Sequence, residues 1–251
     1  MMEFKNRNDF LCFLKGLKFI GAGTQGVCYS DINGKVYKIF RQYLDQEYLS
    51  DNFLEKVNYQ KEDILKFGYI KNNTFKWPKD VVIVMGEVVG YIGKFVHAKP
   101  LYNINPLNID LDKFVRCIKH THDDLSILSK NHVLTYDLMY NIMYGNHFYV
   151  TDCDEFSYSN RKVGLDTRNI RNFDMELYYF LIDNYFDEFI NEYSILKNMY
   201  LRKDTDILYF IELFRKKLSE YLGINVNRLS LAKKCLNKNK LEKEYLRGKV
   251  K

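Results

Sequence analysis

The sequence has few of the features that mark disulfide-stabilised or membrane-spanning proteins. Its five cysteines are scattered and include no C-x-x-C pair, which argues for reduced, buried thiols and against a disulfide framework or a zinc site. No apolar run approaches the roughly 20 uninterrupted residues of a spanning helix. Lys15 and Lys18 break the apolar run near the N-terminus, so no signal peptide is expected. We therefore expect a soluble, cytoplasmic protein with no membrane span.

A chain of 251 residues is long enough to bury a substantial core, as one large domain or as two closely packed lobes. The net charge of +6 is mild, but Lys and Arg gather in residues 233–251. Such a run is typical of a solvated helix face or a frayed tail. The alternative is a basic C-terminal helix that contacts an acidic partner, such as nucleic acid or an acidic membrane surface.

The first hundred residues follow a pattern of short strands with one helical insertion. Asn33-Gly34 indicates a two-residue hairpin turn, because both turn positions favour positive φ. The expected strands are 17–22, 27–31, 35–40, 81–85 and 87–96, and the expected helix is 43–67.

After Pro106 the pattern becomes mainly helical, with a short strand-rich island. The expected helices are 109–130, 174–200, 206–222 and 229–246, and the strands of the island are 133–134, 142–144 and 148–151. This layout predicts an α+β fold with two lobes: an N-lobe over residues 1–97 and a mainly helical C-lobe over residues 98–251.

A glycine motif, G-x-G-x-x-G at Gly21, Gly23 and Gly26, has two incompatible interpretations. In a dinucleotide-binding fold a helix must follow the third glycine. Here a strand and the hairpin turn follow, which excludes that interpretation. The next strand carries Lys38 between apolar neighbours, where its ammonium suits the phosphates of a nucleotide. The alternative is that Lys38 is simply an exposed strand lysine.

A second group of polar residues lies in the stretch from Val133 to Phe156, "VLTYDLMYNIMYGNHFYVTDCDEF". Asp137 and Asn141 flank a tight loop, and Asp152 ends a returning strand. Phosphoryl transfer needs oxygen ligands for Mg²⁺ and a carboxylate near the attacking hydroxyl. The stretch therefore predicts a phosphotransfer site.

Together these motifs resemble the protein-kinase-like superfamily, in its bacterial-type and small-molecule-kinase-like members. The resemblance implies a bilobal fold with an antiparallel-sheet N-lobe that contains one helix and a mainly helical C-lobe. It also implies that ATP and Mg²⁺ are bound. The implied roles are phosphate binding for Gly21, Gly23, Gly26 and Lys38, catalysis for Asp137 with Lys38, and Mg²⁺ binding for Asn141 and Asp152. A helical glutamate that pairs with Lys38 is implied as well, with Glu55 as first choice and Glu62 and Glu47 as alternatives.

Several departures from the family pattern bear on function. Thr135-Tyr136 replaces the His-Arg before the aspartate, Met139 replaces a Lys or His, and Asp152-Cys153-Asp154 replaces D-F-G. With this Asp-Cys-Asp pattern, Asp154 is expected to be either a second metal ligand or an ordinary capping residue of a helix or turn. No A-P-E motif lies between Asp152 and Asp174, which counts against a conventional protein kinase.

We therefore expect a phosphotransferase that moves the γ-phosphate of ATP to an unknown hydroxyl-bearing acceptor, either a protein Ser/Thr or a small molecule. The alternative is a pseudokinase that serves as an ATP-binding or scaffold module. A nucleic-acid-associated role of the basic tail is compatible with either. The histidines and aspartates in His120–Asp124 are interpreted as a solvated helix surface rather than a metal site.

Overall fold

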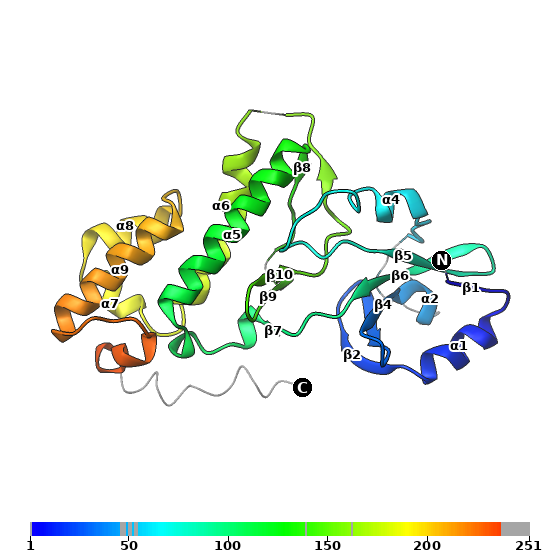
Figure 1. The fold of residues 1–251 in the computed structure, drawn as a ribbon, viewed down its shortest axis with the longest axis horizontal. Coiled ribbons are helices and arrows are strands. Elements are labelled where there is room, and N and C mark those ends of the chain that lie inside the picture. The colour runs from blue at the N-terminus through cyan, green and yellow to red at the C-terminus, as the bar shows by residue number, and fades with distance from the viewer. Residues whose placement is uncertain are drawn as a thin grey trace. The chain divides into compact units, whose positions relative to one another are not determined.

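The computed structural model describes residues 2–45, 49, 52, 55–138, 140–161 and 163–236. The chain forms two compact units: Met1–Lys71 with Lys76–His97, and Asn72–Phe75 with Ala98–Lys251. The fold is α+β, with a mixed six-stranded sheet and several helices (Figure 1). No helix in the described ranges has both the length and the apolar character needed to cross a membrane.

The first unit is built on the six-stranded sheet, in the order β1-β5-β6-β4-β3-β2. β1 pairs with β5 in parallel, and the other neighbouring strands pair antiparallel. The strands are β1 (Met2–Phe4), β2 (Lys18–Ala22), β3 (Gly26–Ser30), β4 (Lys35–Phe40), β5 (Asp80–Val84) and β6 (Glu87–Lys94). The helices are α1 (Arg7–Lys15), α2 (Arg41–Leu44) and α4 (Lys61–Leu65).

The two faces of this sheet have different neighbours because side chains alternate along each strand. On β4, Tyr37 and Ile39 join a core cluster with Phe10 and Leu14 of α1. Phe40 belongs to a second cluster, with Ile64 of α4 and residues of β5 and β6. Lys38 alternates with Tyr37 and Ile39, so its side chain leaves β4 on the Phe40 face.

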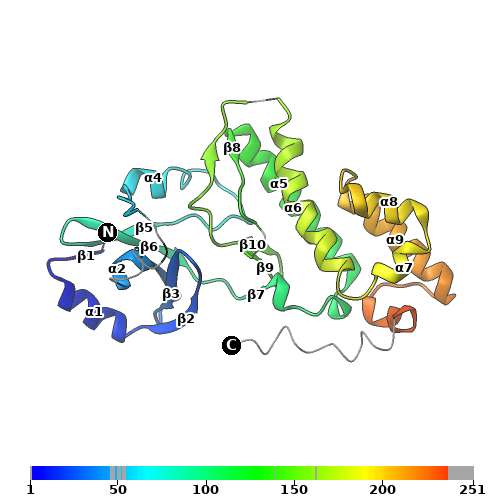
Figure 2. The ribbon, with the colours of Figure 1, turned by 180° about the vertical axis from the view of Figure 1, so that it is seen from behind.

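The second unit packs helices around two small sheets, in the strand orders β10-β9-β7 and β11-β8. Figures 1 and 2 both show α5 and α6 side by side. The strands are β7 (Lys99–Pro100), β8 (Val133–Leu134), β9 (Ile142–Tyr144), β10 (Phe148–Val150) and β11 (Ser157–Tyr158). The helices are η1 (Leu101–Asn103), η2 (Pro106–Asn108), α5 (Leu111–Lys130), α6 (Leu165–Ile182), α7 (Asp187–Asn191), α8 (Ser194–Arg202), α9 (Ile207–Leu222) and η3 (Leu229–Cys235).

A chain of aromatic rings forms the core between α5, α6 and the β9–β10 hairpin. The Phe114 ring lies 5.3 Å from that of Phe148 and 5.8 Å from that of Phe180, measured between centroids. Phe148 in turn contacts Phe173 at 5.3 Å. Edge-to-face and stacked aromatic pairs stabilise a core beyond the area they bury, so the hairpin is held firmly against the two helices.

The segment Asn72–Phe75 belongs to the second unit although both of its flanks belong to the first. Asp124 of α5 is buried, and its Oδ2 accepts hydrogen bonds from the backbone N–H groups of Asn73 and Thr74 and from the Thr74 hydroxyl. Phe75 forms a parallel bridge with Val150. Three donors satisfy a carboxylate that would otherwise be costly to bury.

The expected helix over residues 43–67 is wrong. Among the described residues of this stretch, Leu49 and the elements α2 and α4 are helical, whereas residues 55–60 are irregular. The side-chain amide of Gln42 donates to the backbone oxygen of Val57 at 2.7 Å, and its oxygen accepts from the Val57 N–H at 3.1 Å. These bonds satisfy the backbone of an extended segment, so Val57 needs no helical partners.

The expected helix over residues 174–200 is also wrong, because three helices, α6, α7 and α8, occupy this stretch and α6 begins earlier. α6 follows Gly164, whose φ of 76° lies in the left-handed region that favours glycine. The turn after Ile182 places Phe186 and Phe189 against Phe214 of α9, with centroids 5.1 and 6.1 Å away. Burial of these rings favours the bend over one continuous helix.

Two smaller expectations are corrected as well. Residues 229–235 form the 3₁₀ helix η3 rather than the start of an α-helix, and residues 237–246 of the expected last helix lie outside the described residues. The connection between β3 and β4 has four residues rather than two, because the Asp31 carboxylate accepts from the N–H groups of Asn33 and Lys35. Only Gly34 has positive φ there, at 75°.

Candidate functional site

The glycine motif lies on the β2–β3 hairpin of the first unit. β2 and β3 pair from Lys18 and Ser30 to Ala22 and Val27, so a three-residue loop separates the strands. The Gly23 N–H donates to the oxygen of Gly26 at 2.9 Å, and the Arg41 Nε donates to the oxygen of Gly23 at 2.7 Å. A hairpin, rather than a helix, therefore follows the third glycine.

The three glycines differ in what surrounds them. A Cβ added to Gly21 or Gly23 would meet no heavy atom within 4 Å among the described residues. A Cβ at Gly26 would lie 2.9 Å from the backbone oxygen of Ile39 and 3.1 Å from Cγ of Lys38. The first two glycines leave backbone open to a ligand, whereas Gly26 makes room for the lysine.

Lys38 is not an exposed strand lysine, so that interpretation is wrong. Its side chain is 5% exposed, and lysines are rarely so buried without a compensating environment. Its Nζ lies 5.5 Å from the centroid of the Tyr91 ring, on the neighbouring strand β6, and Lys38 and Tyr91 are directly paired. The ring face attracts the cation, and the strand pairing fixes the position of Lys38.

We predict that Gly26→Ala lowers the free energy of unfolding by about 1–3 kcal/mol, because the new methyl group overpacks the strand beside Lys38. Gly23→Ala is the matched control and should change it by less than about 0.5 kcal/mol. Urea denaturation of both variants measures the difference. Equal effects of the two substitutions would contradict the close approach at Gly26.

Glu55, the first-choice partner of Lys38, was expected on a helix. It lies instead in the irregular segment 55–60 and is exposed. Glu62 is in the first turn of α4 and is exposed as well. Glu47 lies outside the described residues. Because residues 55–60 are irregular, no helix formed by them directs Glu55 at the sheet.

In the second unit, two asparagines of α6 hold the chain just before Asp137. Asn169 is fully buried, and its Oδ1 accepts from the N–H and the hydroxyl of Thr135 at 3.0 and 3.1 Å. Its Nδ2 donates to the oxygen of Val133 at 2.8 Å, and Asn172 donates to the oxygen of Thr135 at 3.1 Å. Thr135 therefore anchors the loop to α6.

Asp137 has an uncommon backbone conformation. Its φ is 45°, in the left-handed region, where Asp is tolerated better than most residues. The Asn141 Nδ2 donates to its backbone oxygen at 2.7 Å and closes the loop. Asp137 is exposed, whereas Thr135 and Leu138 are buried. The buried neighbours and the Asn141 bond hold the loop in a conformation that presents Asp137 outward.

Asn141 and Asp152 lie at the same end of the β9–β10 hairpin. Ile142 pairs with Val150, and the Thr151 N–H donates to the oxygen of Asn141 at 3.4 Å. Asp152 follows directly and is partly buried. The structure therefore brings the hairpin end that bears Asp152 next to the Asp137–Asn141 loop. Because the Asn141 amide nitrogen is bonded to Asp137, its side-chain oxygen is the atom suited to a cation.

Cys153, the residue after Asp152, is buried. Its burial fixes the direction in which the chain continues after the β9–β10 hairpin. Cys153 is 3% exposed, and its Sγ donates to the oxygen of Val150 at 3.6 Å. Asp154 and Glu155 form a turn that the Phe156 N–H closes by donating to the oxygen of Cys153 at 3.3 Å. Asp154 is thus a turn residue. The Cys153 side chain takes the buried position beside the aspartate.

Sequence reasoning missed Glu176, on the same side of α6 as Asn169 and Asn172. Burial and then the negative charge of Asp137 raise the pKa of Glu176 from its ordinary value of 4.5 to about 7. Its carboxylate forms no hydrogen bond or ion pair within the described parts of the chain. Its spacing of seven residues from Asn169 and four from Asn172, which repeats on one side of a helix, was the only signal that could have indicated it.

We predict that Glu176→Gln stabilises the protein at alkaline pH and not at acid pH. The folded-state pKa is raised, so the stability linked to the protonated carboxyl is present below about pH 4.5 and is lost as pH rises through about 7. Gln has nearly the same shape as the protonated glutamate and is uncharged at every pH. Near pH 8 the variant should be more stable than the wild type by about 1 kcal/mol, a value that allows for partial screening of this carboxylate by solvent. Thermal or urea unfolding at both pH values tests this, and a pH-independent difference would contradict it.

The cluster His120–Asp124 is not a solvated helix surface. Thr121 and Asp124 are buried, and His122 Nε2 lies 2.7 Å from Oδ1 of the buried Asp174. Burial raises the pKa of Asp174, although the hydrogen bond to His122 opposes the shift. Only His120 and Asp123 of this cluster are exposed. The apparent metal-ligand pattern instead joins α5 to α6 and to the segment 72–75.

Neither the protein-family models nor the curated proteins compared with this chain gave a match. Within the described residues no group of three or more His, Cys, Asp or Glu side chains could hold a metal ion. Mg²⁺ at a nucleotide needs fewer protein ligands, because phosphate oxygens and waters complete its coordination.

Proposed function

We propose that the chain is an ATP- and Mg²⁺-dependent phosphotransferase with a bilobal kinase-like fold. The observation that carries the proposal is the arrangement around Asp137: a left-handed aspartate, closed by a hydrogen bond from Asn141, beside the hairpin end that bears Asp152. A carboxylate for the acceptor hydroxyl and two oxygen ligands for Mg²⁺ are what phosphoryl transfer requires. The glycine hairpin and the buried Lys38 support the same chemistry.

Each residue has a proposed role that its surroundings support. The open backbone at Gly21 and Gly23 suits close approach of phosphates, and Lys38 supplies a positive charge for them. The oxygens of Asn141 and Asp152 fit Mg²⁺, which prefers hard oxygen ligands and would neutralise phosphate charge there. Asp137 orients the acceptor hydroxyl and accepts its proton while the acceptor oxygen bonds to the γ-phosphorus and ADP leaves.

The proposal is tested by thermal unfolding with ATP in the presence and absence of Mg²⁺. At an ATP concentration 100 times Kd, binding stabilises the folded state by about 2.7 kcal/mol. That corresponds to an increase in Tm of roughly 5–10 °C for a chain of this size. The increase should depend on Mg²⁺ and should be largely lost in Asp152→Ala, and it should persist in Asp123→Ala, an exposed aspartate of α5. An increase that depends on neither Mg²⁺ nor Asp152 removes the metal assignment.

A further inference from the structure

Arg41 holds the loop of the glycine hairpin by two hydrogen bonds. It follows Phe40, the last residue of β4, and its side chain is partly buried. Its backbone N–H donates to the oxygen of Gln25 at 2.9 Å, and its side-chain Nε donates to the oxygen of Gly23 at 2.7 Å. Gly23, Thr24 and Gln25 form the loop between β2 and β3. Arg41 is therefore attached to both ends of the loop that carries the second glycine of the motif.

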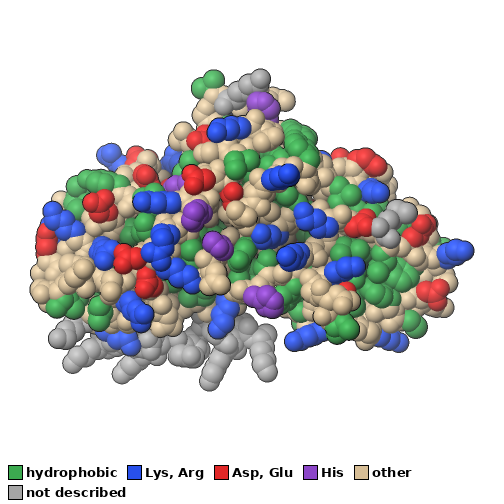
Figure 3. Space-filling view, in the orientation of Figure 1, with side chains coloured by type: hydrophobic (Ala, Val, Ile, Leu, Met, Phe, Trp, Pro, Cys, Tyr) green, Lys and Arg blue, Asp and Glu red, His purple; other side chains and the backbone are tan. Residues whose placement is uncertain are grey.

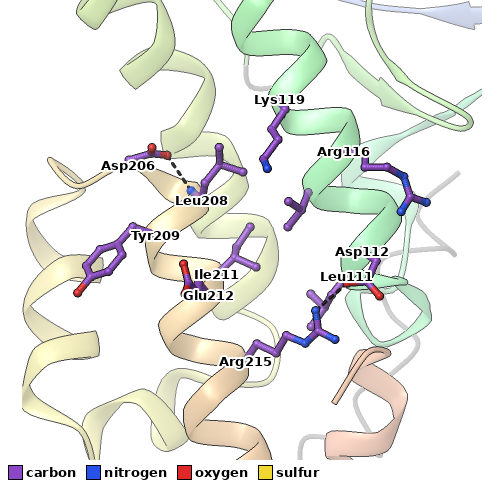
Figure 4. Close-up of a pocket in the computed structure, with 11 residues that line it drawn as sticks. Leu111, Asp112, Arg116, Lys119, Asp206, Leu208, Tyr209, Ile211, Glu212 and Arg215 are labelled. Carbon is purple, nitrogen blue, oxygen red and sulfur yellow. Dashed lines mark hydrogen bonds and ion pairs between the residues drawn. The ribbon is translucent and has the colours of Figure 1, made fainter. Parts of the chain in front are cut away.

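The guanidinium group of Arg41 has donors left over after these bonds. An arginine side chain carries N–H bonds on Nε and on both Nη atoms. The Nη atoms of Arg41 form no hydrogen bond or ion pair with any residue that the structure describes. Arg215 of α9 shows the contrast, because its Nη1 lies 2.7 Å from Oδ1 of Asp112 in the groove between α5 and α9 (Figure 4). The Nη atoms of Arg41 thus remain available to an anionic ligand.

The surroundings of the loop suit a phosphate at this position. The guanidinium group is planar, so the bond from Nε to Gly23 keeps both Nη atoms beside the loop. Space is left there as well, because a Cβ added to Gly23 would meet no heavy atom within 4 Å among the described residues. On the face of the first unit that Figure 3 shows, Lys and Arg side chains are scattered rather than gathered into one basic patch. A phosphate at the hairpin therefore depends on individual cations, and Arg41 is one that the loop itself holds in place.

We infer that Arg41 is a phosphate-binding residue, whose Nη atoms donate to phosphate oxygens of the bound nucleotide while its Nε holds the loop. This inference rests on the proposed function and adds a residue to it. The guanidinium fork matches two oxygens of one phosphate, and such charge-assisted hydrogen bonds are about twice as strong as neutral ones. A triphosphate carries several negative charges. Lys38 supplies one positive charge for them, and Arg41 supplies a second.

The experiment is isothermal titration of the full chain with ATP and Mg²⁺, for the wild type and for two substitutions at Arg41. Arg41→Gln removes the charge, and ATP should bind about 10- to 100-fold more weakly, as expected when hydrogen bonds to a charged group are lost. Arg41→Lys keeps the charge without the fork, so its dissociation constant should lie between those of the wild type and Arg41→Gln. Arg7→Gln removes the same charge from an exposed position on α1 and should leave ATP binding unchanged.

Salt separates a phosphate contact from a purely structural role of Arg41. If Arg41 binds phosphate, added salt weakens ATP binding less steeply in Arg41→Gln than in the wild type, because one screened attraction is gone. If Arg41 only holds the loop, both variants bind equally weakly and the salt dependence is unchanged. Circular dichroism shows whether each variant is folded, and Arg41→Lys, the milder change, is read alone if Arg41→Gln does not fold.

Wild-type affinity in either Arg41 variant, or an unchanged salt dependence in Arg41→Gln, overturns the inference while ATP binding by the protein itself stands. A wild type that binds no ATP overturns the proposed function together with the inference. The two failures are therefore told apart by the wild-type titration alone.

Discussion

Replacing Asp137 by Asn is expected to reduce phosphate transfer from ATP by about 100- to 10,000-fold, the usual contribution of a general acid or base. Asn has nearly the same shape, tolerates the left-handed conformation, and leaves the backbone oxygen that accepts from Asn141 unchanged. The loop therefore persists, and the loss is confined to the carboxylate. ATP binding should remain close to that of the wild type.

The measurement is release or transfer of the labelled γ-phosphate, as ATP hydrolysis or autophosphorylation, with wild type and variant at equal concentration. Asp123→Asn controls for loss of an exposed carboxylate in the same unit. Equal rates for wild type and Asp137→Asn would remove Asp137 from its proposed role. A wild type that binds ATP with Mg²⁺ and turns over none would identify a pseudokinase, the alternative expected from the missing His-Arg pair.

Replacing Lys38 by Met is expected to weaken ATP binding by about 10- to 150-fold. A hydrogen bond to a charged group contributes about 1.5–3 kcal/mol, and each 1.4 kcal/mol changes affinity tenfold. Met has a similar length and fills the space beside Gly26 and Tyr91 without the charge. The variant therefore separates the contribution of the ammonium from that of the packing.

Isothermal titration of ATP in the presence of Mg²⁺ checks this prediction. Lys35→Met is the matched control, because Lys35 lies on the same strand and is exposed. We expect an unchanged dissociation constant for Lys35→Met. An equal loss of affinity in both variants would indicate a general effect of positive charge rather than a specific site at Lys38.

The parts of the fold that local patterns determine were predicted well. The β3–β4 hairpin, the β5–β6 hairpin and α5 each depend on alternation, turn residues or helical spacing within a few residues. The β9–β10 hairpin is of the same kind, and it carries Asn141 and Asp152 at one end. Among these elements only the turn between β3 and β4 was predicted wrongly, because the Asp31 carboxylate holds a turn of four residues rather than two.

The errors came from contacts between distant residues. Gln42 satisfies the backbone of Val57, so an apolar pattern that suits a helix becomes an extended segment, and Glu55 leaves the position expected for it. Asn169 contacts Thr135 across 34 positions, and Asp124 contacts Thr74 across 50. Residue types at such separations carry no periodic signal, so neither contact was predictable from pattern alone.

Glu176 illustrates the same limit at the site itself. It lies 39 positions from Asp137, and only the fold brings its carboxylate close enough for the two charges to interact. From the sequence it is one acidic residue in an amphipathic helix. Partial burial on α6 makes it a group that titrates near neutral pH beside the proposed catalytic aspartate.

Labelling with an acyl-phosphate derivative of ATP tests the central claim most directly. The acyl group of this reagent transfers to a lysine amine that lies beside the bound phosphates, and ATP leaves. We predict that mass spectrometry finds the acyl group on Lys38, and that excess ATP with Mg²⁺ prevents the labelling. Labelling spread over exposed lysines such as Lys35 and insensitive to ATP would contradict nucleotide binding at the glycine hairpin.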